Sequence, residues 1–349
     1  MADDNIDLQA ELDYHRRAVD TEYFDLSIRE IVRMVEGAEI RVAPAYQRQF
    51  RWNESVQSAL VESLLLGLPI PAIFVATNKD GTWDVVDGLQ RIATILRFFG
   101  IDVPEAEKLQ FSKNPLRLKE MSQLTRFAEL TYEDLPMPIR LMLGKRYLRV
   151  QVLSDKSDHD VRFELFRRLN AGAVALTPQE IRSCVYQGPF LDLIDELSNI
   201  PEFESLLKLQ KKNQNDGTTE EMVLKFYAYL EKMESFDGKV TRFLNRYMFD
   251  RMSDTKLKKD RELFIQTATF LSTVLGGKPF LRQGAPTTPL NQLEGVLAGI
   301  AMIFREGGSP KVPKPGWEND TQLVGFSKQG TNSRPMLKGR ILRSKEIFS

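Results

Sequence analysis

The sequence of 349 residues has one cysteine and two histidines, and it has no long apolar run. Cys184 alone excludes an internal disulfide and a cysteine-based zinc cluster within the chain, and its helical surroundings predict a small buried side chain. His15 and His159 lie in polar surroundings without a pattern, which disfavours a histidine-based metal site. No run approaches the roughly 18 apolar residues that cross a bilayer, and the acidic start is unlike a signal peptide. We therefore expect a cytoplasmic protein without a membrane partner.

A net charge of zero hides a separation of charge along the chain. Residues 1–40 hold 4 basic and 11 acidic side chains, whereas residues 221–349 hold 21 and 13. The basic C-terminal part is suited to nucleic acid, to a partner's acidic surface or to the acidic N-terminal region. Its densest basic stretch, 327–340, indicates an anion-binding loop, with a disordered cationic tail as the alternative. The candidate anion contacts there are Asn332, Arg334, Lys338 and Arg340.

The first 155 residues combine helix and strand signals. Ser27 and Asn53 each precede apolar residues at helical spacing, so they are predicted to cap two helices. Segments 72–77 and 82–86 flank a turn that contains Asn78 and Gly81, which is typical of a β-hairpin, and 147–153 is predicted as a third strand.

Beyond residue 157 the apolar spacing is helical, and the sequence indicates no further strand. The segments with this spacing are 158–169, 178–186, 190–197, 220–234, 240–252, 257–275 and 290–305. Glycines and prolines after residue 306 mark a linker. We predict an α+β protein with a small α/β domain over 1–155, a mostly helical domain over 156–306 and a basic C-terminal tail over 307–349.

The stretch 87–91, Asp-Gly-Leu-Gln-Arg, lies where a buried strand passes into an amphipathic helix. Such a junction binds phosphate in many α/β proteins, because glycine permits a tight turn and the first helical amides lack internal partners. Arg91 adds a planar charged fork in the first turn. The pattern predicts an anion site made by Gly88, Gln90 and Arg91, and a plain strand-to-helix turn with a solvated arginine is the alternative.

Segment 44–52 packs two arginines, two glutamines and three aromatic residues into nine positions. Arginine and glutamine present planar donor arrays and aromatic rings offer faces for stacking, so the segment is suited to recognising a ligand. We expect Gln47 and Arg48 to enter the cleft of the 87–91 turn, with Tyr46 and Arg51 as additional anion contacts. Alternatively the aromatic residues are core anchors and the arginines pair with carboxylates.

The third segment, 166–182, contains a helix start in which Thr177 is the N-cap and Glu180 completes a capping box. Asn170 precedes an alanine and a glycine, so it is a candidate donor to a ribose or phosphate, or a residue that tolerates a left-handed turn. Either Arg167 or Arg168 is a further candidate anion contact, and one of them is expected to pair with Glu164 on the preceding helical turn.

Taken in order, these elements resemble the N-terminal domain family of the GmrSD type IV restriction systems. The family pattern has a tyrosine-glutamine-arginine element, a proline-x-proline, an aspartate-glycine-glutamine-glutamine-arginine element and an arginine-leucine-asparagine stretch followed by a threonine-x-x-glutamate helix start. The matching positions are 46–48, 69–71, 87–91 and 168–180. Leu89 departs from the pattern, because the family usually has its first glutamine there. The resemblance covers residues 23–190 directly.

The resemblance implies a ParB/sulfiredoxin-like fold, in which a glycine-x-x-arginine turn holds nucleotide phosphates, and a role in defence against foreign DNA. For the 87–91 turn we expect a nucleoside triphosphate as the ligand, with or without Mg²⁺. Asp87 then holds Mg²⁺ through water and is the candidate catalytic residue, or it orients Arg91 and the turn. Related proteins carry a histidine-asparagine-histidine nuclease, but no histidine follows residue 160, so this chain is not expected to cut DNA alone.

Three hypotheses follow. In the first, the chain is a nucleotide-binding sensor or regulator of a DNA defence system, with or without NTP hydrolysis, which either acts alone or works with a nuclease effector on a separate subunit. Alternatively, it is a DNA-binding module that recognises phosphate or modified DNA without nucleotide chemistry. As a third alternative, it is a structural adaptor whose arginines form internal ion pairs.

Overall fold

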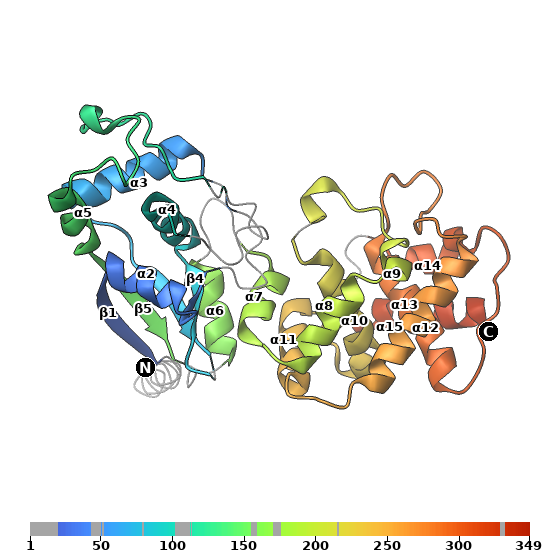
Figure 1. Cartoon of the computed structure of the whole chain (residues 1–349). Helices are drawn as coiled ribbons and strands as arrows, with labels where there is room; N and C mark the ends of the chain where they lie inside the picture. The colour runs from blue at the N-terminus through green and yellow to red at the C-terminus, as the bar shows by residue number, and fades with distance from the viewer. Residues whose placement is uncertain are drawn as a thin grey trace, which may run out of the picture. The chain divides into compact units, whose positions relative to one another are not determined.

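The computed structural model describes residues 20–42, 50, 52–78, 80–101, 112, 114–154, 159–169, 176–214, 216–328 and 332–349. The chain divides into two compact units, Met1–Ala175 and Leu176–Ser349 (Figure 1). The first unit combines a sheet with helices and the second is helical, so the α+β class predicted from the sequence is confirmed. None of the described helices has both the length and the apolar character needed to span a bilayer.

A mixed five-stranded sheet organises the first unit, with strand order β1-β5-β3-β4-β2. Its strands are β1 (Thr21–Ser27), β2 (Ile40–Arg41), β3 (Ile73–Thr77), β4 (Trp83–Asp87) and β5 (Tyr147–Leu153). The pairs β1–β5 and β3–β4 are antiparallel, whereas β3–β5 and β2–β4 are parallel. The predicted hairpin and third strand are confirmed. The sequence did not reveal β1 and β2, because β1 is an edge strand without a buried residue and β2 is only two residues long.

Helices complete the first unit. They are α2 (Ile28–Glu36), α3 (Glu54–Leu66), α4 (Leu89–Phe99), α5 (Met137–Gly144) and α6 (His159–Leu169), with a 3-10 turn at Thr125–Phe127. The predicted N-caps are confirmed, because the Ser27 side chain accepts from the Glu30 amide at 3.2 Å and that of Asn53 from the Val56 amide at 2.9 Å. The apolar core joins α2, α3 and α4 to the sheet.

Helix α6 packs on the sheet through Phe166, which is buried and lines a small cavity with Val86 and Leu153. This helix therefore belongs to the first unit. The predicted domain boundary after residue 155 differs from the division at residue 175 for this reason. A change of secondary-structure pattern marked the boundary in the sequence, whereas packing decides it in the fold.

Glu62 ties α3 to the loop that follows residue 121. Its carboxylate accepts from the amides of Ser122, Gln123 and Leu124 at 2.7 to 3.1 Å and from the Ser122 hydroxyl at 2.9 Å. Only 6% of Glu62 is exposed. The amide of Leu124, with the other donors, outweighs desolvation and lowers the pKa of Glu62 to about 2.

Replacing Glu62 by glutamine is expected to cost the first unit about 2 kcal/mol at neutral pH, because one amide oxygen cannot satisfy four donors. Since the folded pKa of Glu62 lies below its ordinary value, the carboxylate stabilises the fold above about pH 4.5, and this contribution disappears as the pH falls toward 2. Denaturant titrations at several pH values measure both effects. Glu36→Gln, at an exposed position on α2, is the control and should leave both unchanged.

The second unit is a helical assembly. Its helices are α7 (Pro178–Val185), α8 (Pro189–Ser198), α9 (Pro201–Glu204), α10 (Thr218–Lys232), α11 (Val240–Arg251), α12 (Lys258–Val274), α13 (Leu290–Arg305), α14 (Thr321–Gly325) and α15 (Arg334–Phe348), with 3-10 turns at Lys211–Asn213, Met233–Ser235 and Trp317–Asn319. None of the residues described in this unit lies in a strand. The predicted capping box of Thr177 and Glu180 opens α7, and Cys184 is buried there as expected.

Helix α15 packs closely along α13, and two glycines of α13 make this approach feasible. A methyl group at Gly299 would lie 2.7 Å from Ser344 Cβ, and one at Gly295 would lie 2.8 Å from Arg340 Cγ. Leu337, Ile341 and Phe348 of α15 are buried, as are two polar residues, Arg340 and Ser344. The expectation of a separate basic tail from residue 307, and the alternative of a disordered tail, therefore fail for residues 334–348. These residues form a packed helix of the second unit.

Candidate phosphate-binding turn

The turn at 87–91 joins β4 to α4 through a glycine in the left-handed region. Gly88 has φ 106° and ψ 8°. A side chain there would place its Cβ 3.1 Å from Ile73 Cγ1 and 3.2 Å from Arg91 Nη2. The backbone conformation and the close neighbours both favour glycine. The first amides of α4 come directly after this glycine. They have no hydrogen-bond acceptor within the helix, because no helical carbonyl lies four residues before them.

Arg91 is fixed across this turn. Its Nη2 donates to Asp87 Oδ2 at 3.0 Å and to the Ala72 carbonyl oxygen at 3.1 Å. The side chain is 14% exposed, and its Nε is buried without a hydrogen-bond partner. Among the described residues, only Nη2 of this guanidinium has hydrogen-bond partners. Arg91 thus stands in a defined orientation at a helix N-terminus with donor capacity left for an anion.

Asp87 orients Arg91, which is one of the two roles predicted for it. Its side chain is 39% exposed, and its Oδ2 accepts a hydrogen bond from Arg91. The described residues include no group of three or more His, Cys, Asp or Glu side chains that could hold a metal ion. The other role of Asp87, an outer contact to Mg²⁺, stays a prediction.

Gln90 contributes to the fold around the turn. Its Oε1 accepts from the Trp52 amide at 3.1 Å, and the Trp52 carbonyl oxygen accepts from Gln57 Nε2 at 2.9 Å. Gln57 in turn accepts from Arg97, which also pairs with Glu54 at 2.7 Å. Sequence reasoning missed this network, which holds the residues after 51 against α4. The carbonyl end of Gln90 is therefore structural, and its expected contact with a ligand is untested.

Several predicted site residues lie outside the described residues: Tyr46, Gln47, Arg48, Arg51 and Asn170. Their roles stay predictions. Arg168 is described and is exposed on α6, where its Nε donates to Glu164 at 2.7 Å. Arg167 also donates to Glu164, so the pairing predicted for one of these arginines is made by both. The hydrogen bond from Arg167, with that from Arg168, outweighs desolvation and lowers the pKa of Glu164 to about 2.

The C-terminal candidates belong to the second unit, whereas the turn belongs to the first. Asn332 is exposed, Arg334 Nε donates to the Phe236 carbonyl oxygen at 3.0 Å, and Lys338 pairs with Glu234 at 2.6 Å. Arg340 is the exception, since it is fully buried with Nη2 3.7 Å from Glu294. The expectation that Arg340 contacts an anion from solvent is wrong, because its position on α15 faces α13.

The fold and the turn define an α+β domain with an oriented arginine at a strand-to-helix junction. Residues 31–187 match the model of the GmrSD restriction endonuclease N-terminal domain. The match begins in α2, includes the sheet from β2 to β5 together with the turn, and ends after α7. This part of the chain is therefore a domain of the GmrSD N-terminal family, as its motifs predicted, and the family implies a role in a restriction or defence system. No curated protein matches the chain.

Proposed function

We propose that the first unit binds a nucleoside triphosphate at the 87–91 turn and serves as the nucleotide-responsive sensor of a restriction-type defence system. In this proposal DNA is cut by a nuclease effector on a separate chain. The observation that carries the proposal is the orientation of Arg91, which Asp87 and the Ala72 carbonyl oxygen fix through one nitrogen beside the free end of α4. The family match supports the defence role.

The chemistry of the turn suits a phosphate more than a neutral ligand. The positive end of the helix dipole and the first-turn amides attract an anion, and a guanidinium binds two phosphate oxygens at once. Mg²⁺ bound with the nucleotide would screen charge on the phosphate oxygens, with Asp87 as the carboxylate at hand. For hydrolysis, Asp87 is also the candidate to orient the attacking water.

Arg91→Ala is expected to weaken nucleoside triphosphate binding at least about tenfold, since a charged hydrogen-bonded contact contributes roughly 1.5 to 3 kcal/mol. Calorimetric titration with each nucleoside triphosphate, with and without Mg²⁺, gives the dissociation constants. Arg33→Ala is the matched control, because Arg33 is an exposed arginine of the same unit that pairs with Glu30 at 2.7 Å on α2. Unchanged affinity in Arg91→Ala, with a normal thermal melt, would exclude this site.

Asp87→Asn in the same titration separates the two roles of that carboxylate. If Asp87 only orients Arg91, the variant loses affinity equally with and without Mg²⁺. If it holds Mg²⁺, the loss appears only with the metal. Duplex DNA titrated in parallel tests the hypothesis of a DNA-binding module, and binding of DNA but of no nucleotide would favour that module.

A further inference from the structure

A broad groove of about 1120 Å³ lies in the first unit, apart from the residues of the 87–91 turn. It is bounded by the end of α3, the proline-containing segment 67–72, helix α5 and the first residues of β5. In Figure 1, α5 lies beside the end of α3. The groove shares Ala72 with the proposed nucleotide site, because the Ala72 carbonyl oxygen accepts from Arg91, but none of residues 87–91 lines it. The proline-x-proline motif at 69–71 therefore shapes a second feature of the domain.

The groove is lined by large apolar side chains that are open to solvent. Leu68 is 52% exposed, Leu141 42%, Met142 40% and Tyr147 71%. Leu66 and Met137, which are 41% and 57% exposed, are next to the lining residues Gly67 and Pro138. Scattered exposed apolar residues need no explanation, but a contiguous group marks an interaction site. Methionine and leucine at such a surface adapt to an apolar partner segment.

The lining of the groove carries more basic than acidic side chains, which favours an acidic ligand. Lys145, Arg146 and Arg149 line it, and Asp25 is the acidic residue among its lining residues. Asp25 is engaged by Arg149 at 3.0 Å. The charges of Lys145 and Arg146 are therefore left to attract carboxylates, which fits a segment that combines leucines with aspartates or glutamates.

We propose that residues 1–19 of this chain dock in the groove. This segment has five acidic and two basic residues, and Leu8 and Leu12 are four positions apart, the spacing that would place two side chains on one face of a helix. Its leucines would meet the apolar floor, and its carboxylates would meet Lys145 and Arg146.

The reach of the segment is sufficient. The chain enters β1 at Thr21, opposite Leu153, and β1 runs to Ser27, opposite Tyr147 at the groove. That strand spans roughly 20 Å at about 3.3 Å per residue. The 13 residues from Leu8 to Thr21 would span about 20 Å as a helix, so a return along β1 would bring Leu8 to the groove.

A disulfide test decides the proposal in the full chain. Leu8→Cys combined with Met142→Cys is expected to form an intrachain disulfide under mild oxidation, seen by peptide mapping of the monomer. The native Cys184 is 4% exposed and does not compete. The control pairs Leu8→Cys with Val56→Cys, an exposed position on the first turn of α3 that does not line the groove, and should give at least fivefold less disulfide.

Charge reversal supplies the second measurement. Asp7→Lys with Glu11→Lys should lower the disulfide yield at least threefold, whereas Glu262→Lys, at an exposed position on α12, should not. Equal yields at Met142 and Val56, or no disulfide at either, would overturn the proposal. A disulfide that links two chains would also overturn it, because the segment would then occupy the groove of a second copy.

Discussion

Glu294→Ala is expected to destabilise the second unit by about 3 to 5 kcal/mol, the cost of breaking a buried charge pair. Glu294 is 2% exposed on α13. Its Oε1 accepts from Lys225 Nζ at 3.0 Å, and its Oε2 lies 3.7 Å from Arg340 Nη2. Alanine would leave Arg340, on α15, in the interior without this carboxylate. Lys225 would lose one of its two anionic partners.

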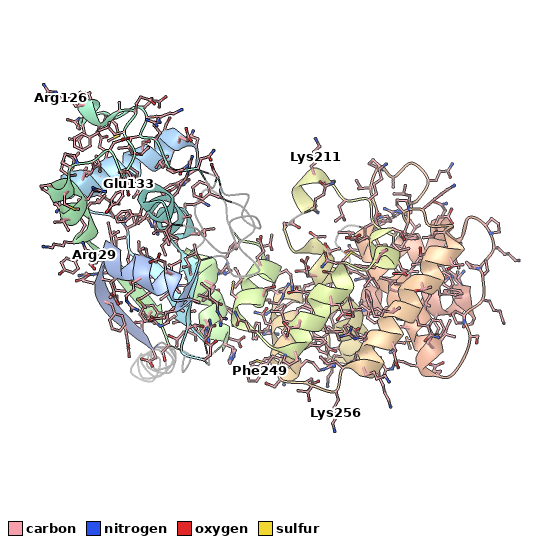
Figure 2. All side chains as sticks on the ribbon, viewed as in Figure 1. Arg29, Arg126, Glu133, Lys211, Phe249 and Lys256 are labelled. Atoms are coloured by element: carbon pink, nitrogen blue, oxygen red, sulfur yellow. The ribbon has the colours of Figure 1, made fainter. Side chains whose placement is uncertain are left out.

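The surroundings explain why the effect should be large. Lys225 also bonds Glu221 at 3.0 Å, and Glu221 pairs with Arg182, which is fully buried on α7. Alternating charges therefore connect α7, α10, α13 and α15. Burial alone would lower the pKa of Lys225, but Glu294 and Glu221 outweigh it and raise that pKa. Lys211 and Lys256, by contrast, project from the surface of the same unit (Figure 2).

Urea titration monitored by amide hydrogen exchange in α10, α13 and α15 measures the change in the free energy of unfolding. Exchange at these amides reports the second unit separately from the first. Glu294→Gln keeps one acceptor and should cost less than Glu294→Ala. Glu262→Ala, which breaks an exposed pair with Lys258 at 3.8 Å, is the control and should stay within about 0.5 kcal/mol. A loss below about 1 kcal/mol in Glu294→Ala would show that the buried pairs are replaceable by water or by rearrangement.

The sequence predicted the local features of the fold well. The caps at Ser27, Asn53 and Thr177 depend on residues three positions apart, and the β3–β4 hairpin depends on a short turn, so both are visible in a short window. The docking of α15 is not visible in that way. Its buried residues recur at helical spacing, but the cations between them suggested a solvated tail, and only the glycines of α13 show that a helix fits there.

The candidate site was also predictable only in its local features. The glycine turn and Arg91 were predicted, because a strand, a glycine and a helix are adjacent in the sequence. The bond from Arg91 to the Ala72 carbonyl oxygen spans 19 residues, and the bond from Trp52 to Gln90 spans 38. The pairing of β3 with β4 and the packing of α3 on α4 bring these partners together. The spacing of residues in the sequence does not predict these tertiary contacts. The groove was likewise not predicted, although its proline-x-proline was noticed.

Truncation after Phe326 is expected to abolish cooperative folding of the second unit. The truncation removes α15 and with it Leu337, Ile341 and Phe348, all buried. Burying a large apolar side chain contributes about 1.5 to 3 kcal/mol, and a domain has only about 5 to 15 kcal/mol of net stability. The stability lost with these three side chains is therefore comparable with the net stability of the whole unit. The face of α13 that carries Gly299 would also become exposed.

Trp317 reports this loss directly, because its ring stands edge-on to Phe348 with centroids 4.8 Å apart. Its fluorescence should shift to the solvent-exposed value, and amides of α13 should lose their protection from exchange. Lys338→Ala in the full chain is the matched control. It removes an exposed cation that pairs with Glu234 and leaves the helix in place. If α15 served only as a cationic contact for DNA, truncation would leave Trp317 and the exchange pattern unchanged and would alter only the salt dependence of DNA binding.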